Sequence, residues 1–322
     1  MGSKELDLLD KKIMYYLDIN SRISASKLAK ILKQSKDTIN FRIKRLFEND
    51  YIKDTYIITN NSKLRLYYYK IYFKFKNTTS EKEKEIFEYL RVQKNIAYLA
   101  DVEGVYNCIM LLLVRTPKDM VDFLVPFMHN YGTYILDKSI HTVVTAHRFN
   151  QKLLYVGNTN TSFTYPIEIG DYKLDLIDSK IINLVSNNAR MPIIDIARKI
   201  GVDPKVVSYR LKKLEEDKII LGYVTAINID KLGLQFTQIN IALNDVEVKK
   251  KIMSFFDETN RCLYAVDVFG KYDLVIEIHV ENNAQLNKIM TEFKKKFVNK
   301  YNDYDILIVN KELVVVWSAF SF

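Results

Sequence analysis

The chain has 322 residues, about twice the length of an average domain, so we expect two or more domains. Apolar residues make up 48% and charged residues 27%, which is typical of a folded globular protein and excludes a disordered one. The net charge of +9 is compatible with a nucleic-acid partner. There is no signal-peptide segment and no apolar run near the roughly 18 residues that span a bilayer, so we expect a cytoplasmic protein without a membrane segment. Two cysteines, Cys108 and Cys262, are too few for a disulfide framework or a cysteine zinc site.

The sequence contains the same long unit twice. Residues 6–13 (LDLLDKKI) return as residues 174–181 (LDLIDSKI), 168 positions later, and about 19 of the 70 aligned positions that begin at residue 6 are identical. Further along, residues 101–107 (DVEGVYN) match residues 267–273 (DVFGKYD) at an offset of 166. A unit this long is too large for a solenoid repeat, so we expect each copy to be a two-domain module.

The first part of each copy has the pattern of a helix-turn-helix domain. In copy two, a short helix at residues 192–199 is followed by Gly201, and the next helix begins with Asp203 as N-cap and Pro204 at its first position. Copy one repeats this pattern, but Lys33 stands where copy two has Gly201. Because glycine adopts positive φ at low cost, we expect the first turn to differ in shape and its helix to dock less well.

The second part of each copy alternates strands and helices in the order β-α-β-β-α-β, which is typical of a ferredoxin-like domain. Such a sheet has helices on one face, and its other face must be covered, here by the sheet of the other copy. Candidates for that covered apolar face are Tyr68, Phe73, Val275 and Ile278. The expected elements are 66–75, 81–92, 96–103, 107–114, 118–129 and 134–147 in copy one, and 234–243, 246–257, 262–269, 274–280, 284–298 and 304–320 in copy two.

The predicted fold class is therefore α+β, with two helix-turn-helix (winged-helix-like) domains and two ferredoxin-like βαββαβ domains. The polar, turn-rich stretch between the copies is interpreted as a linker with a short strand at 152–156. The predicted boundaries are 1–63 and 173–231 for the helix-turn-helix domains, 64–148 and 232–322 for the ferredoxin-like domains, and 149–172 for the linker.

This combination resembles the Lrp/AsnC (feast/famine) family of transcription regulators, with the whole unit duplicated in tandem. The family-like segments are clearest in copy two: residues 174–178, 188–190, 196–202, 210–215, 220–223 and 270–273. Copy one departs from them with Lys33, Asp54, Arg65 and Asn107 in place of Gly201, Gly222, Gly233 and Asp273. Ordinary members pair as dimers through their sheets, so the resemblance implies an intrachain pseudo-dimer or a homo-oligomer.

The resemblance and the basic helices together predict binding to double-stranded DNA. By our count residues 1–60 carry roughly +4 and residues 173–229 roughly +3, so the two heads hold most of the net charge. A fused, asymmetric dimer should prefer an imperfect palindrome with unequal half-sites. The predicted DNA-binding residues are Lys36, Thr38, Asn40, Phe41, Arg42, Lys44, Arg45, Lys205, Ser208, Tyr209, Arg210, Lys212 and Lys213.

A small effector such as an amino acid is implied by the resemblance near the Gly-x-Tyr-Asp turn. In this sequence the turn corresponds to Gly270, Tyr272 and Asp273, and more weakly to Gly104, Tyr106 and Asn107. Glycine would let backbone amides approach a carboxylate, and the aspartate would hold an ammonium group. The alternative is that these residues form a hairpin turn between two strands and nothing more.

No enzymatic motif, cofactor site or metal site is expected from the sequence. His141 and His147 share a strand face, but two imidazoles without a third ligand are usually structural. Cys108 and Cys262 are expected to be small buried hydrophobic residues. The main alternative function is a tetrapyrrole enzyme, since the same module resembles that of the siroheme decarboxylases. A third class, an assembly protein without DNA binding, is favoured only if both basic helices are buried.

Overall fold

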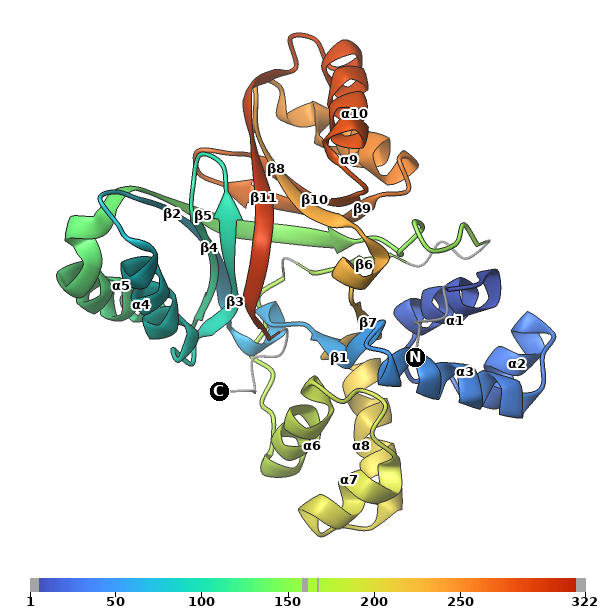
Figure 1. The fold of residues 1–322 in the computed structure, drawn as a ribbon. Helices are drawn as coiled ribbons and strands as arrows, with labels where there is room; N and C mark the ends of the chain where they lie inside the picture. The colour runs from blue at the N-terminus through green and yellow to red at the C-terminus, as the bar shows by residue number, and fades with distance from the viewer. Residues whose placement is uncertain (1–5, 158–161, 167, 317–322) are drawn as a thin grey trace. The chain divides into compact units, whose positions relative to one another are not determined.

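The computed structural model describes residues 6–157, 162–166 and 168–316, and it divides the chain into two compact units (Figure 1). The head unit contains residues 1–60, 148–163 and 173–234, and thus the helix-turn-helix regions of both copies. The sheet unit contains residues 61–147, 164–172 and 235–322, and thus both ferredoxin-like regions. The compact units therefore combine equivalent parts of the two copies.

Each copy contributes three helices and one strand to the head unit. The third helix of copy two has the predicted N-cap, because Asp203 accepts from the Lys205 amide, and in copy one Ser35 accepts from the Thr38 amide in the same way. The two strands pair antiparallel, with Tyr56 opposite Val224. The elements are α1 (Leu8–Ile19), α2 (Ala25–Leu32), α3 (Lys36–Glu48) and β1 (Ile52–Thr59) in copy one, and α6 (Leu176–Ser186), α7 (Ile193–Ile200), α8 (Pro204–Glu216) and β7 (Ile220–Ile227) in copy two.

The turns between the second and third helices have the same shape in both copies. Lys33 lies in the left-handed region at φ 54° and ψ 47°, close to Gly201 at φ 75° and ψ 40°. The same hydrogen bond closes each turn, from Gln34 N to Ala29 O in one and from Val202 N to Ala197 O in the other. The prediction of a differently shaped first turn is wrong: helix packing keeps Lys33 in a conformation that costs a non-glycine residue about 1 kcal/mol.

The stretch that follows copy one packs onto the first head. The Arg148 guanidinium and the Asp18 carboxylate form a fully buried ion pair at 2.5 Å, and the Gln151 amide donates to the same carboxylate. Leu154 is buried in the hydrophobic core that includes α1. The prediction of a strand at 152–156 is therefore wrong, because this segment forms turns that pack onto the head. A short strand, β6 (Phe163–Thr164), lies further along the stretch.

The sheet unit confirms the predicted order β-α-β-β-α-β in both copies. Helices α4 and α5 lie on one side of the strands of copy one, and α9 and α10 lie on one side of those of copy two (Figure 1). Copy one has β2 (Tyr67–Phe75), α4 (Ser80–Arg91), β3 (Ile96–Glu103), β4 (Cys108–Val114), α5 (Pro117–Tyr131) and β5 (Ile135–Arg148). Copy two has β8 (Gln235–Leu243), α9 (Lys249–Glu258), β9 (Cys262–Phe269), β10 (Leu274–Val280), α10 (Asn283–Lys296) and β11 (Tyr301–Val315).

The last strand of each copy joins the two sheets into one closed ring. Strands β2, β4 and β3 are followed by β11 of the other copy, then by β8, β10 and β9, and finally by β5, which also pairs with β2. Thus β5 and β11 each pair with the first strand of their own copy and with a strand of the other. We call this ring the barrel.

The face of the strands that points into the barrel is more polar than predicted. Phe73 packs against Phe127 of α5 at 5.0 Å between ring centroids, so it faces the helices. Ile278 also faces the helices, because its neighbour Glu277 points inward. Both were wrongly assigned to the covered face. The buried polar side chains inside the barrel include Lys70, Tyr72, Gln238 and Asn240.

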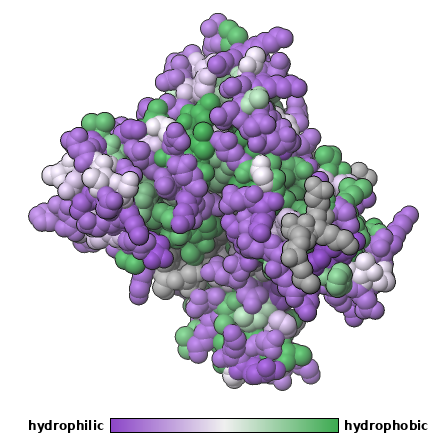
Figure 2. Space-filling model, viewed as in Figure 1, coloured by the Kyte–Doolittle hydropathy of each residue, from purple (hydrophilic) through white to green (hydrophobic). Residues whose placement is uncertain are grey.

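The surface is mostly hydrophilic in the view of Figure 2, with hydrophobic patches scattered over it. Cys108 and Cys262 are free and buried, as predicted. In the described part of the chain, no helix is both long enough and apolar enough to span a membrane.

Candidate nucleic-acid interface

The second helix of each helix-turn-helix pair, α3 or α8, presents a polar and basic face to solvent. Most of the predicted DNA-binding residues lie on these two faces. Thr38 is half-buried, and the exposed ones are Lys36, Asn40, Phe41 and Lys44 on α3 and Lys205, Ser208, Tyr209, Lys212 and Lys213 on α8. The structure thus leaves both basic helices accessible, which removes the condition that favoured a pure assembly protein.

A large aromatic side chain projects from the same position of both helices. Phe41 and Tyr209 are each 64% exposed, and they are 168 positions apart, as the repeat requires. Val206 on α8 is also exposed. The lower lobe of Figure 2, which Figure 1 identifies as α6–α8, accordingly shows hydrophobic areas among hydrophilic ones. Apolar groups on a recognition helix are suited to contact the methyl group of thymine.

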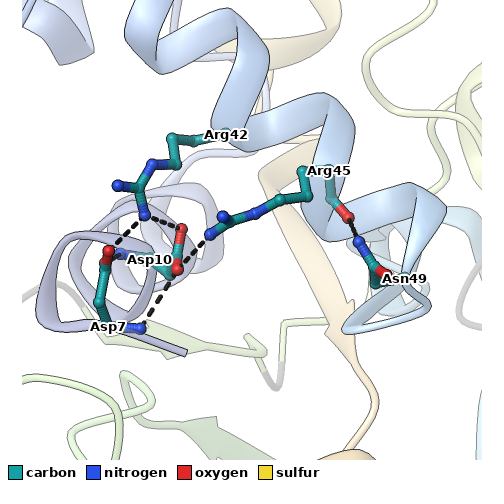
Figure 3. Close-up of polar contacts among 5 residues, drawn as sticks. All are labelled: Asp7, Asp10, Arg42, Arg45 and Asn49. Carbon is teal, nitrogen blue, oxygen red and sulfur yellow. Dashed lines mark hydrogen bonds and ion pairs between the residues drawn. The ribbon is translucent and has the colours of Figure 1, made fainter. Parts of the chain in front are cut away.

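Two of the predicted DNA contacts in copy one are engaged in ion pairs with α1 (Figure 3). Arg42 Nη1 lies 2.5 Å from Asp7 Oδ2 and 3.0 Å from Asp10 Oδ1, and Arg45 Nη2 lies 2.5 Å from Asp10 Oδ2. Asp10 is fully buried, so the two pairs that it forms are partly shielded from water, whereas Asp7 is half exposed. The Leu-Asp-x-x-Asp motif therefore fixes α3 against α1.

Asp7 of this network and Asp178, an acid of the same motif in copy two, have pKa values displaced from the ordinary value. Partial burial acts to raise the pKa of Asp7, but the hydrogen bond and charge of Arg42 outweigh it and hold that pKa below its ordinary value. In copy two, Arg210 lies 2.6 Å from Asp175 and 3.4 Å from Asp178. There, burial together with the charge of Asp175 raises the pKa of Asp178.

The two exposed helices α3 and α8, which we call the recognition helices, consequently differ in how many of their basic side chains pair with acids of the first helix of the head. Lys213 occupies the position of Arg45 in copy two and is exposed, whereas Arg45 is turned toward Asp10. Lys44 and Lys212 are both exposed, and each forms a surface ion pair one helical turn away, with Glu48 and Glu216. Such exposed pairs are worth little, so phosphates can compete for these lysines.

The glycines of the predicted effector turns lie against the last strand of the other copy. A Cβ on Gly104, which has φ +143°, would be 2.6 Å from the carbonyl oxygen of Ile306 in β11. A Cβ on Gly270 would be 2.6 Å from the ring of His141 in β5. Glycine at these positions is therefore explained by close packing inside the sheet unit.

The remaining residues of these turns are held by similar contacts in both copies. Asn107 Oδ1 accepts from the Phe75 amide at 3.0 Å, and Asp273 Oδ2 accepts from the Leu243 amide at 2.8 Å. Tyr106 and Tyr272 are almost fully buried. An asparagine can thus replace the aspartate in this backbone contact, although it brings no charge for an amine.

The comparisons with known proteins agree with this geometry. A family model for the winged helix-turn-helix DNA-binding domain matches residues 6–53 and 174–220. An HTH-type transcriptional regulator of Pyrococcus abyssi is 27% identical over 43% of this chain and 95% of its own length. The leucine-responsive regulatory protein of Haemophilus influenzae is 26% identical over 36% of this chain and 72% of its own. The proline dehydrogenase transcriptional activator of Rhodobacter capsulatus is 29% identical over 37% and 79%.

Each relative therefore matches one copy of the repeat. The chain is similar to Lrp/AsnC regulators, and the similarity fits a unit that is present twice. One solved structure shares the fold over nearly the entire chain: the siroheme decarboxylase NirDL, with a TM-score of 0.66 and 13% identity, covers 98% of this chain and 96% of its own.

Copy one keeps the backbone conformation of copy two at Arg65, where copy two has a glycine. Arg65 has φ 56°, close to the 66° of Gly233. At Gly222, where copy one has Asp54, a Cβ would be 2.3 Å from the Phe163 ring, so only copy two needs glycine there.

Sequence reasoning missed one residue that lies against the predicted effector turn of copy two. His141 is fully buried, stacks on Tyr272 at 5.1 Å between centroids, and accepts from the Tyr272 amide through Nε2 at 3.3 Å. Its period-two position on a strand gave no sign that it would meet the turn of the other copy. Within the described ranges, no group of three or more His, Cys, Asp or Glu residues is placed to hold a metal ion.

Proposed function

We propose that this DNA-binding Lrp/AsnC regulator reads an imperfect palindrome with both heads at once, as a covalently fused pseudo-dimer. The observation that carries the proposal is the head unit itself, in which β1 and β7 pair and both recognition helices remain exposed. Paired recognition helices bind half-sites about one helical turn, or a multiple of it, apart.

The side chains divide into two groups by the contacts they favour. Lys36, Lys44, Lys205, Lys212 and Lys213 would bind phosphates, which position the protein without reading sequence. A second group would face base edges and consists of Thr38, Asn40 and Phe41 in copy one and Ser208 and Tyr209 in copy two. Arg42, Arg45 and Arg210 would support these contacts by fixing the helices, since all three pair with acids at the start of the first helix of their own head.

Unequal half-sites are part of the proposal. Asn40 offers the paired donor and acceptor that suit adenine, whereas its counterpart Ser208 is tolerant of either base type. Phe41 contributes only apolar surface, and Tyr209 adds a hydroxyl. The two halves of the operator should therefore differ at the bases that these positions face.

A small effector such as an amino acid would act through the sheet unit. The residues proposed for it are Gly270, Tyr272 and Asp273, with Gly104, Tyr106 and Asn107 as the weaker counterpart in copy one. Asp273 supplies the negative charge that an ammonium group needs, which Asn107 lacks. The reducing interior of the cell suits a protein whose two cysteines are free and buried.

A tetrapyrrole enzyme is the second candidate, and one observation favours it. The siroheme decarboxylase NirDL shares the fold of both copies, at 13% identity. Visible absorbance of a tetrapyrrole that copurifies with the protein, or that binds when siroheme is added, would support this alternative.

The test of the DNA-binding proposal is fluorescence anisotropy with the fragment upstream of the protein's own gene and with random DNA, across a salt series. We expect affinity to fall steeply with salt for both, and the upstream fragment to stay bound at salt concentrations that release random DNA. Lys212→Ala should weaken binding to both DNAs and reduce the salt slope by about 1. Phe41→Ala should cost about 1–3 kcal/mol on the upstream fragment alone.

The matched control is Lys118→Ala, which removes an exposed lysine from α5 in the sheet unit. If neither DNA binds at low salt, or if Phe41→Ala weakens both DNAs equally, sequence reading by α3 is wrong.

A further inference from the structure

The inside of the barrel is not symmetric, although the two copies that build it are equivalent. Lys70 of β2 lies across from Leu111 of β4, and Gln238 of β8 lies across from Glu277 of β10. Lys70 corresponds to Gln238 and Leu111 to Glu277 in the repeat. One copy thus supplies a base and an aliphatic residue where the other supplies an amide and an acid.

The base and the acid meet across the two copies. Lys70 Nζ lies 2.7 Å from Glu277 Oε1, and the two side chains are only 6% and 12% exposed. Removing either partner would leave a charge in the barrel with no opposite charge, which is among the most costly changes in a protein interior.

A second contact is also between unlike residues. Tyr72 and Asn240 occupy equivalent positions in the repeat, and they touch each other, with Tyr72 Oη 3.3 Å from Asn240 Oδ1. Gln238 Nε2 donates to the Tyr72 hydroxyl at 2.9 Å. Equivalent residues in contact mark the approximate twofold axis, where a symmetric dimer would place two identical side chains.

Pairing of two copy-one sheets, or of two copy-two sheets, would disrupt both contacts. Two copy-one sheets would place Lys70 opposite Leu111 and Tyr72 against a second tyrosine. Two copy-two sheets would leave Glu277 without a base and Asn240 against a second asparagine. The first arrangement overfills the axis and buries a lone charge, and the second leaves a void as well as a lone charge.

We propose that the Lys70–Glu277 pair and the Tyr72–Asn240 contact form a pairing code, by which the sheet of copy one accepts only the sheet of copy two of the same chain. The partner of each half is therefore the other half of the chain. Because each copy carries one head, this pairing gives every molecule one head of each kind. The pairing proposal does not depend on whether those heads bind DNA.

The experiment is a charge-inversion cycle in the full-length chain, followed by thermal unfolding. Lys70→Glu and Glu277→Lys should each lower the unfolding midpoint by about 10 °C or more. The double variant should recover at least half of that loss. Lys70→Met and Glu277→Gln serve as milder versions in case the inversions do not fold. The control inverts the exposed pair Lys118–Asp122 on α5, for which we expect no significant shift.

The same variants distinguish pairing within a chain from pairing between chains. When the Lys70→Glu and Glu277→Lys chains are coexpressed, the mixture should be as unstable as either chain alone, because each barrel keeps its own mismatch. Recovery in the mixture would show that halves of different chains pair and would overturn the proposal. Single variants as stable as the wild-type chain would overturn it too, since Lys70 would then not face Glu277. The assay contains no DNA, so its failure is separate from that of the proposed function.

Discussion

Arg22 of the first head and Arg190 of the second head make equivalent contacts, each with backbone carbonyls of the other head. Arg22 Nη1 donates to the carbonyls of Ala189 and Met191, at 2.6 and 3.2 Å, while Arg190 Nη1 donates to those of Ser21 and Ile23. Burial and the charge of Arg22 both lower the pKa of Arg190, so the two cations are close enough to repel each other. The carbonyl contacts hold them in place and join the two heads.

We therefore predict that Arg190→Ala lowers the free energy of unfolding of the head unit by about 2–3 kcal/mol, because two carbonyls lose a charged donor. Urea unfolding measures the change. The control is Arg198→Ala, whose side chain is 75% exposed and should matter by less than about 0.5 kcal/mol. Equal effects of the two variants would mean that the contact between the heads adds no stability.

The turns at Lys33 and Gly201 offer a reciprocal test of backbone strain. Lys33→Gly should stabilise the protein by about 0.5–1 kcal/mol, since glycine removes the cost of positive φ but adds freedom to the unfolded chain. Gly201→Ala should destabilise it by a similar amount, and a new Cβ there would meet nothing within 4 Å, so the effect is that of the backbone alone. Thermal unfolding of both variants checks the signs. A destabilised Lys33→Gly protein would contradict this account.

Substitution of Asp273 distinguishes a structural role of the turn from a role in binding an effector. Asp273→Asn should leave stability within about 0.5 kcal/mol of the wild-type protein, because Asn107 makes the same backbone contact in copy one. Asp273→Ala should cost about 1–3 kcal/mol through the unpaired Leu243 amide. If an amino acid binds here, isothermal titration should show its binding lost in Asp273→Asn, which still folds. Unchanged binding in that variant would exclude Asp273 as the ammonium ligand.

His141 should make the sheet unit sensitive to acid. Burial lowers its pKa to about 4, with the charges of Lys70 and Lys271 acting in the same direction and the Lys70 backbone acting against it. A histidine whose folded pKa lies below its unfolded value of about 6.5 favours folding above pH 6.5, and this contribution is lost as the pH falls toward 4.

The predicted loss over that interval is about 3 kcal/mol. His141→Leu, which introduces the residue that copy two has at the equivalent position, Leu307, should flatten the stability profile between pH 7 and 4. The control is His129→Gln, since His129 is exposed on α5. Parallel profiles for wild type and His141→Leu would assign the acid sensitivity to other groups.

The sequence alone was sufficient for the repeat, the element order and the recognition helices, because caps and periodicity are local signals. It was insufficient where a side chain's partner lies in the other copy. Phe73 and Ile278 were placed on the wrong face because the prediction went against strand alternation, by which residues an odd number of positions apart, such as Tyr68 and Phe73, point to opposite faces. The strand expected at 152–156 was wrong because burial of Leu154 and the Arg148–Asp18 pair decide that stretch.

The shape of the first turn was wrong for a related reason. Propensity treats Lys33 as unfavourable in the left-handed region, but packing of α2 and α3 imposes that conformation. The three arginines Arg42, Arg45 and Arg210 looked like DNA contacts because their charge is visible in the sequence, whereas their acidic partners 32 to 35 residues earlier are recognised only in the structure.

The closed ring of strands has a consequence for synthesis of the chain. Strand β11 pairs with both β3 and β8, and it follows both of them in sequence. While a ribosome is still producing copy two, β3 of copy one therefore has an open edge, and such edges pair readily with other chains. The nascent protein is exposed to aggregation until β11 emerges, so chains interrupted before residue 301 should be substrates for chaperones and proteases.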